Sequence, residues 1–376
     1  LHSLRRRQRQ MCIRDRAFSL TAVSKPLLAV DLGLAKALLA VLPLASNISQ
    51  IVFRPIFGSL SDRKGRRHFI IVATLIYLFS YLLQAFARTA IDVIVAGFIV
   101  GIGVSMLWPC LMAYASEIGE DTRNEISLLM TFSFLGSVIG YVFSGVLAEV
   151  IGWRLTFIVS AFIVLVAFFV AYLSIKDTNI VKVKTPLVSS VRSSIKIGIK
   201  TTSNVSSIGL RPVINTYMPV IVIEGGYSQS IAGFVITGSS LIFTGMQRPS
   251  SILSKKKWFS TFTINTIALT TIVLLGLTYE LGMISASIVL YFTHSALSGL
   301  LPSSQLVDLT ENTREKGSSA GGFGLALSFA RLLGSTSATI GGILDLSVSS
   351  ITAAIDTAGL ILILYSLCTR IIGIKT

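Results

Sequence analysis

The chain of 376 residues is 52% hydrophobic and 13% charged, with a mean hydropathy of +0.78. A soluble globule could not keep so much apolar surface away from water, so the composition excludes that class and indicates a polytopic membrane protein. The formal charge of +15 would favour a nucleic-acid partner if the basic residues shared one face. They lie instead in short runs between apolar segments, which is typical of topology signals, so no nucleic-acid partner is expected.

Catalytic and metal-binding patterns are missing from the sequence. The three cysteines, Cys12, Cys110 and Cys368, have neither a paired spacing nor a metal-ligand spacing, so no disulfide framework and no metal site are predicted. No Walker loop is present, so ATP is not expected to drive the protein directly. We therefore expect no cofactor and no enzymatic activity.

Residues 1–16 are polar and arginine-rich where a first membrane span should lie. We interpret them as foreign to the protein. The alternatives are a basic cytoplasmic arm or a targeting peptide, although a targeting peptide would need an apolar core that these residues lack. Residues 17–23, before Pro26, are then the surviving end of a truncated first helix.

Apolar segments of the length that crosses the hydrocarbon core as a helix follow in order along the chain. The sequence predicts about eleven of them, so we expect an all-α membrane protein in which the first helix is incomplete. The predicted spans are 37–58, 68–87, 91–112, 126–148, 153–175, 202–223, 229–249, 258–279, 282–304, 317–343 and 353–372.

The longest polar stretch, 176–201, divides the chain into two nearly equal halves. A loose internal repeat, in which residues 107–125 resemble residues 300–316, supports that division. We predict an N-terminal helical half at 17–175, a linker at 176–201 and a six-helix half at 202–376.

The basic residues mark one side of the membrane. Connections on this side carry most of them, and by the positive-inside rule they are cytoplasmic. With strict alternation, both ends of the chain are also cytoplasmic, in a plasma (inner) membrane. The basic connections are 59–67, 113–125, 176–201, 250–257 and 305–316.

The segment from Gly58 to Arg67, GSLSDRKGRR, is the most specific motif in the chain. It resembles the loop between the second and third helices of major facilitator superfamily transporters, G-x-L-[AS]-D-R-x-G-R-[RK]. The resemblance implies that family's fold of two six-helix halves and secondary transport. The motif residues are Gly58, Asp62, Arg63, Gly65, Arg66 and Arg67.

The same resemblance implies a cytoplasmic gate. In the family, the motif aspartate meets the positive end of a helix of the other half, which here begins near Gly317. In the family, a motif arginine at the position of Arg66 pairs with an acid at the end of the fourth helix. The resemblance therefore implies a pair between Arg66 and Glu117. The alternative is that the motif is only a topology signal and a helix cap.

Two further family patterns are present in altered form. Gly101 and Gly103 match R-x-x-x-G-x-G, but Gly97 occupies the arginine position, which removes the residue that serves proton coupling in many members. A pattern of exporters, G-x-x-x-G-P-x-x-x-G, has Tyr141 in place of its proline. Its glycines, which also suit close helix packing, are Gly136, Gly140 and Gly145.

Ionisable side chains inside membrane spans are costly and tend to face a cavity or a partner. Arg211, His294 and Arg331 lie on spans whose family counterparts line the central cavity. Guanidinium groups suit carboxylate or phosphate, and a neutral histidine could accept a proton. The alternatives are snorkelling of Arg211, a structural ion pair of Arg331 and a helix-to-helix hydrogen bond of His294. Asn215, one helical turn after Arg211, is a further candidate for the same substrate site, and weaker candidates are Asn47, Gln50 and Trp108.

These observations predict secondary active or facilitated transport of a small solute, with an organic anion as the favoured cargo, by alternating access. The expected partners are the lipid bilayer and the solute, a coupling proton stays open, and the protein is expected to be a monomer. Three alternatives also stay open: proton-coupled efflux of hydrophobic compounds, a non-functional fragment without its first helix, and a membrane-embedded enzyme or receptor-like protein.

Overall fold

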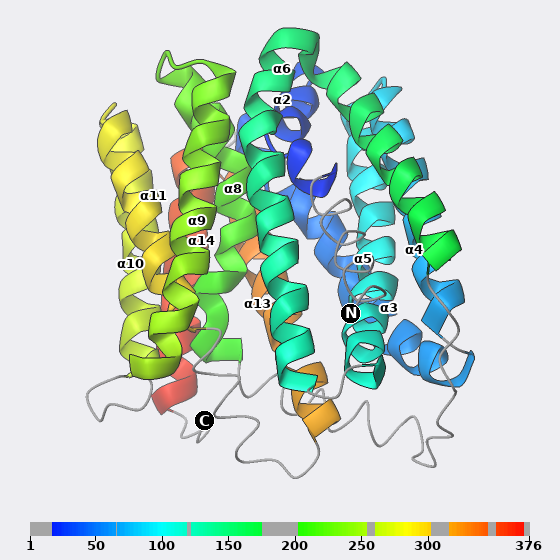
Figure 1. Cartoon of the computed structure of the whole chain (residues 1–376). Coiled ribbons are helices and arrows are strands. Elements are labelled where there is room, and N and C mark those ends of the chain that lie inside the picture. Colours follow the sequence, from blue (N-terminus) through cyan, green and yellow to red (C-terminus); the bar gives the residue numbers. More distant parts are fainter. Residues whose placement is uncertain are drawn as a thin grey trace. The chain divides into compact units, whose positions relative to one another are not determined.

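A computed structural model describes residues 17–64, 66–118, 122–174, 202–253, 260–301, 316–344 and 351–371 (Figure 1). These residues form helices joined by short turns, and no strand occurs among them. The predicted all-α architecture is therefore confirmed for the described part of the chain.

The chain divides into two compact units that are not continuous in sequence. Unit 1 comprises Leu1–Gly33, Ala45–Thr185 and Ser228–Phe234. Unit 2 comprises Leu34–Leu44, Pro186–Tyr227 and Val235–Thr376. Each unit thus includes one short segment from the opposite half of the sequence.

In unit 1, α4 packs against both α5 and α6, and the short helix α2 packs against α6 and α5. Tyr77 and Tyr81 of α4 are fully or almost fully buried, as is Phe157 of α6. The helices are α2 (Ser24–Asp31), α3 (Val41–Lys64, of which the first residues belong to unit 2), α4 (Arg66–Ala85), α5 (Ala90–Ile118) and α6 (Thr122–Ser174).

In unit 2, α10 packs against α11 and α14, and α8 packs against α13. The elements are the 3₁₀ turns η1 (Lys36–Leu38) and η2 (Ser203–Val205) and the helices α8 (Ser206–Glu224), α9 (Gln229–Leu253), α10 (Thr261–Glu280), α11 (Ile284–Gly299), α13 (Lys316–Leu344) and α14 (Ile351–Ile371). The first turns of α9 belong to unit 1.

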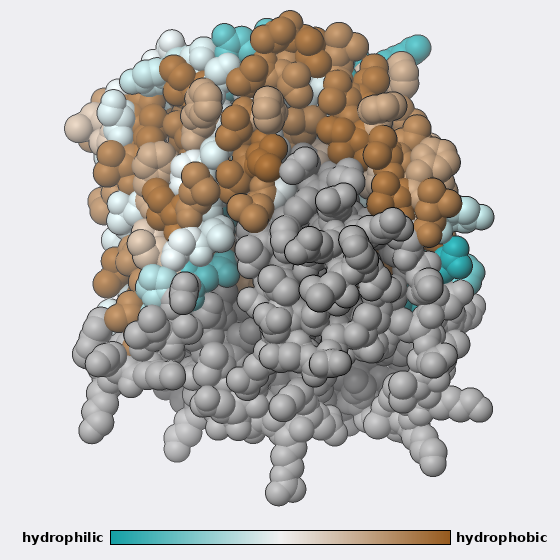
Figure 2. Space-filling model, in the orientation of Figure 1, coloured by the Kyte–Doolittle hydropathy of each residue, from teal (hydrophilic) through white to brown (hydrophobic). Residues whose placement is uncertain are grey.

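Large apolar side chains cover the outside of these helices, as the brown surface in Figure 2 shows for the face in view. Phe162 is 65% exposed and Leu360 is 51% exposed, which a chain in water would not tolerate across a whole surface. Seven described segments are long and apolar enough to cross a membrane. Helices α8, α11 and α13 are not among them, and these three carry Arg211, His294 and Arg331.

Three boundaries differ from the sequence-based expectation. Helix α3 continues to Lys64 and α4 begins at Arg66, so most of the predicted connection 59–67 is helical. A turn at residues 21–23 ends the helical residues 17–20, and the predicted connection after them contains α2, which holds Pro26 in its first turn, where its missing N–H costs no hydrogen bond. The predicted spans 126–148 and 153–175 meet in α6 and are separated only by Gly152, whose φ of 78° and ψ of 161° suit glycine.

Candidate functional site

The arginines of the Gly58–Arg67 motif connect helices of unit 1. Arg66 is 9% exposed and donates from Nη1 to Ser61 Oγ at 3.1 Å. Arg67 donates from Nη2 to the Tyr172 carbonyl at 3.1 Å, and its guanidinium lies 5.8 Å from the centre of the Tyr172 ring. The start of α4 is thereby tied to the end of α3 and to the end of α6.

The rest of the predicted cytoplasmic gate lies outside the described residues. This applies to the surroundings of Gly58 and Gly317, to Gly65 and to the side chains of Asp62, Arg63 and Glu117. The pairings of Asp62 with the α13 start and of Arg66 with Glu117 therefore stay predictions.

The predicted polar residues of α3 are buried within unit 1. Asn47 is 4% exposed, and Gln50 donates from Nε2 to Ser46 Oγ at 3.2 Å. The Gln50 Oε1 accepts from Arg54 Nη2 at 3.1 Å, so this amide is used within its own helix. Trp108, on α5, is half-buried.

The predicted glycines lie at close helix contacts. A Cβ at Gly101 would collide with Ser49 Oγ and the Ser46 carbonyl, so α3 and α5 approach closely there. A Cβ at Gly103 would lie 3.1 Å from Cε2 of Tyr77 on α4. A Cβ at Gly145 of α6 would collide with the Gln229 carbonyl at the start of α9, while Gly136 and Gly140 are buried.

In unit 2, the guanidinium of Arg211 lies against α9. Its Nη2 donates to Ser240 Oγ at 3.3 Å and to the Ser239 carbonyl at 3.4 Å. Its Cζ is 3.8 Å from the centre of the Phe243 ring, a distance at which the cation and the aromatic face attract each other. These contacts orient the Arg211 side chain from α8 across to α9.

Arg331 comes from α13, which crosses α8 at close range. A Cβ at Gly209 would collide with the backbone carbonyl of Ala330, so the two backbones nearly touch at that level. Arg331 follows Ala330 on α13, and Arg211 is two residues after Gly209 on α8. The two predicted arginines therefore originate at one helix crossing.

His294 of α11 is fully buried and has a defined tautomer. Its Nδ1 lies 3.0 Å from the carbonyl oxygen of Ala268 on α10. Because a carbonyl only accepts hydrogen bonds, Nδ1 carries the proton and Nε2 of the neutral ring is an acceptor. This Nε2 has no hydrogen-bond partner among the described residues.

Further hydrogen bonds join α11 to the helices that hold Arg211. Ser295 Oγ lies 2.6 Å from Ser239 Oγ, and the Tyr291 hydroxyl donates to Asn215 Oδ1 at 2.7 Å. The structure thus brings Arg211, Asn215 and His294 into one polar layer formed by α8, α9 and α11. Asn47 and Trp108 belong to unit 1.

Two residues that sequence reasoning did not select also stand out. Lys25, predicted in a connection, lies half-buried on α2 and makes no ion pair or hydrogen bond through its ammonium with any described residue. Asn265, fully buried on α10, accepts from Ser207 N and donates to the Ser203 carbonyl and to Ser206 Oγ, each at 3.0 Å. For Asn265, the available signal was an amide inside an apolar span. For Lys25 there was no signal, because the sequence predicted a connection where α2 lies.

Comparison with known proteins identifies the family. Residues 13–335 match the model of the Major Facilitator Superfamily. An uncharacterized MFS-type transporter of Methanocaldococcus jannaschii is 26% identical over 216 residues, which are 54% of this chain and 55% of that protein. The sialic acid transporter NanX of Escherichia coli is 27% identical over 142 residues, 37% of this chain and 35% of its own. The matched regions thus span about half or less of these relatives.

Among solved structures, the xylose transporter XylE from E. coli, in a partially occluded inward open conformation, has the same fold. The TM-score is 0.73 at 13% sequence identity, and the match covers 99% of this chain and 98% of that one. Together with the membrane-length helices, the match to the family model over residues 13–335 shows that the chain is a multi-pass membrane protein and belongs to the Major Facilitator Superfamily.

Proposed function

We propose that this chain carries a small organic anion across a membrane by alternating access. The family assignment supports transport over catalysis, and the halves 17–175 and 202–376, joined by the linker 176–201, would be the moving parts. The names of the similar proteins point to different cargoes, sialic acid and xylose. The choice of cargo therefore depends on the residues of this chain.

One observation carries the choice of an anion: Arg211 and Arg331 start from the same close crossing of α8 and α13. A charged side chain in a membrane helix costs free energy, so two charged side chains that start from one helix crossing need a function. Their guanidinium groups offer forked donors that fit a carboxylate or a phosphate. Their proposed role is to bind the anionic group of the solute.

The neighbouring polar groups would complete the site. His294 Nε2, as an acceptor, would receive a hydroxyl or a proton carried by the solute. Asn215 would orient the solute, and Asn47 and Trp108 are weaker candidates for contacting it.

The remaining features follow from the same proposal. Asp62, Arg66, Glu117 and the α13 start near Gly317 would form the cytoplasmic gate. Both chain ends would be cytoplasmic in a plasma (inner) membrane, and the protein would work as a monomer without a cofactor. A proton is the proposed coupling ion to test, because no ATP-binding loop is present.

The test is uptake into proteoliposomes, with lactate, succinate, citrate and sialic acid compared with the lipophilic cation ethidium. We expect uptake of at least one carboxylate. Arg331→Gln should lower kcat/KM for that carboxylate by about 100-fold, which corresponds to the loss of a charged hydrogen bond, and Arg331→Lys should restore part of it. An imposed proton gradient should change the rate if a proton is coupled.

Arg88→Gln is the matched control, because this exposed arginine lies in the turn between α4 and α5. It should leave uptake unchanged. Transport of ethidium without any carboxylate would contradict the proposal and favour efflux. A folded protein that moves none of these solutes would favour the non-functional alternative.

A further inference from the structure

The side chain of Arg211 lies flat against an aromatic ring. Its Cζ is 3.8 Å from the centre of the Phe243 ring. Two carbon atoms in van der Waals contact are about 3.5–4.0 Å apart, so at this distance the Cζ lies over the face of the ring and not beside its edge. The face of a phenyl ring carries the negative part of its quadrupole, which attracts a cation.

Two serines of α9 hold the same guanidinium within its plane. The Arg211 Nη2 donates to the Ser240 hydroxyl at 3.3 Å and to the Ser239 carbonyl at 3.4 Å. The N–H groups of a guanidinium all point outward in the plane of the group. The ring therefore sets the plane of the guanidinium, and the two serines set its rotation within that plane.

These three contacts come from one face of α9. Phe243 is three residues after Ser240 and four after Ser239, and both spacings place side chains on the same face of a helix. The exposed fractions are 0% for Ser239, 7% for Ser240 and 6% for Phe243. Water therefore has little access to this side of the contact, and the attraction between a cation and a ring is stronger where water is excluded.

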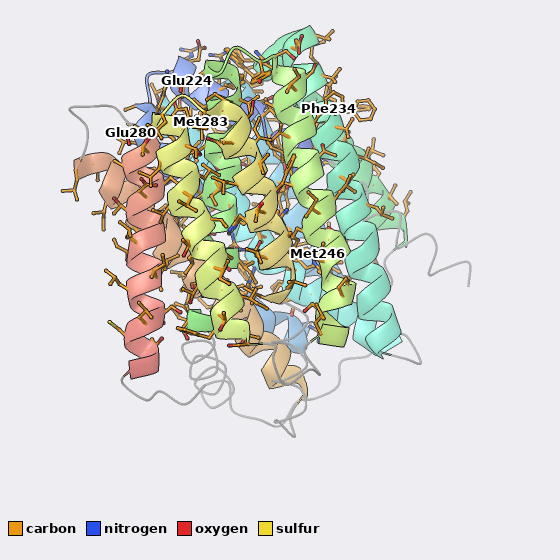
Figure 3. All side chains as sticks on the ribbon, turned by 90° about the vertical axis from the view of Figure 1, so that its left-hand side faces the viewer. Glu224, Phe234, Met246, Glu280 and Met283 are labelled. Carbon is orange, nitrogen blue, oxygen red and sulfur yellow. The ribbon has the colours of Figure 1, made fainter. Side chains whose placement is uncertain are left out.

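Helix α11 supports this part of α9 from another side. Ser295 Oγ lies 2.6 Å from Ser239 Oγ. A Cβ at Gly299 would lie 2.6 Å from the Phe243 carbonyl oxygen and 3.0 Å from the Cβ of Met246, which Figure 3 labels on α9. The backbone that carries the Phe243 ring thus packs directly on α11, which limits where the ring can lie.

The stacked ring restricts how an anion can bind to Arg211. Phe243 occupies one face of the guanidinium. Hydrogen bonds to a carboxylate form along the edge of the group, in its plane, where paired N–H donors match the two carboxylate oxygens. The ring that fixes this plane therefore fixes the orientation of the bound carboxylate. It also opposes the extension of Arg211 toward the membrane interface, to which long basic side chains otherwise snorkel.

We propose that Phe243 is a positioning residue of the anion site, whose ring holds the Arg211 guanidinium in the plane in which this group binds a carboxylate. This inference rests on the proposed transport of an anion and adds a residue that acts only through Arg211. A phenylalanine is ordinary in a membrane helix, so the sequence does not single it out. The proposed role depends on the electrons of the ring, so an aliphatic side chain of similar bulk cannot replace it.

The test varies the electrons of the ring and leaves its shape nearly unchanged. Mono-, di- and trifluorinated phenylalanine are placed at position 243 by nonsense suppression, because each fluorine withdraws electron density from the ring face. Uptake into proteoliposomes is measured with whichever of lactate, succinate, citrate and sialic acid the unchanged protein carries fastest. KM should rise with each added fluorine, by about tenfold over the series, while kcat stays within about twofold.

A second measurement detects the stacking without any solute. Protons that lie over the face of an aromatic ring resonate at lower frequency in NMR spectra, and the guanidinium protons of Arg211 should show this shift. The variant Arg211→Lys identifies their signals by its loss of them. Phe243→Leu should remove the shift and raise KM at least as much as the trifluorinated ring. Unshifted signals in the unchanged protein would overturn the inference.

Phe234 is the matched control, because Figure 3 labels it on the same helix and its side chain is 54% exposed. The same fluorinated residues at position 234 should leave KM unchanged, and an equal rise of KM at both positions would overturn the inference. If the unchanged protein carries none of the four carboxylates, the proposed function fails and this inference fails with it. If it carries one of them but KM does not respond to fluorine at position 243, only this inference is overturned.

Discussion

At the scale of single residues, Asn265 organises the start of a neighbouring helix. Its amide accepts from Ser207 N and donates to the Ser203 carbonyl and the Ser206 hydroxyl. The Ser207 N–H lies in the first turn of α8, where helical N–H groups have no internal partner, and the Ser203 carbonyl lies in η2. One buried side chain on α10 therefore sets where α8 begins, and α8 carries Arg211.

Replacement of this amide should destabilise the protein measurably. Asn265→Leu leaves the Ser207 N–H and the Ser203 carbonyl buried without this partner, which should cost about 2 kcal/mol of unfolding free energy. Thermal unfolding in detergent is the measurement. Thr270→Ala is the control, because Thr270 is exposed on the same helix and its hydroxyl donates to the Thr266 carbonyl. It should have little effect on stability. Equal unfolding temperatures for the two variants would contradict the role of Asn265.

At the scale of helices, the crossing of α8 and α13 depends on one glycine. Gly209 lets the Ala330 backbone approach so closely that a methyl group would have no space. The obstacle is backbone, which cannot rotate away as a side chain does. The crossing therefore sets the distance between α8 and α13 and the positions of Arg211 and Arg331 along the two helices.

A methyl group at this crossing should separate the helices. Gly209→Ala should lower the unfolding free energy by about 1–3 kcal/mol, the usual cost of overpacking, and raise the KM for a transported anion because Arg331 moves away. Gly245→Ala is the matched control, since a Cβ at Gly245 would meet nothing within 4 Å and alanine favours a helix. If both variants unfold at the same temperature, the close crossing is wrong.

Helix positions could largely be predicted from the sequence, whereas helix ends could not. Runs of apolar residues predicted each long helix, because hydropathy is a local property. The connection expected at 59–67 is wrong in part because Leu60, Ser61 and Lys64 are compatible with a helix, so α3 continues to Lys64 and α4 begins at Arg66. Helix α2 was missed because, in a sequence, a proline that is permitted in a first turn looks the same as one that ends a helix.

At the scale of the whole molecule, the charge distribution predicts orientation. Basic connections alternate with connections that carry few charges, and positively charged loops resist translocation. Met283 lies 53% exposed in the turn between α10 and α11, on a predicted outer connection. Ser190 belongs to the linker 176–201, on the predicted cytoplasmic side.

Single thiols should report this orientation in intact cells. In a background without native cysteines, Met283→Cys should react with a membrane-impermeant maleimide, whereas Ser190→Cys should react only after permeabilisation. The physical reason is that the reagent cannot cross the bilayer while the linker stays on the side of the basic loops. The opposite pattern would reverse the predicted topology.

The sequence by itself determined the class of the protein, its helical spans and its family, because composition and the spacing of the Gly58–Arg67 motif are local properties. Tertiary structure alone decided which helices meet. Lys36 and Glu224 are 188 residues apart, and Ser239 and Ser295 are 56 apart. No local pattern encodes such contacts, because they depend on how whole helices pack. The same reason applies to the layer around Arg211 and to the tautomer of His294.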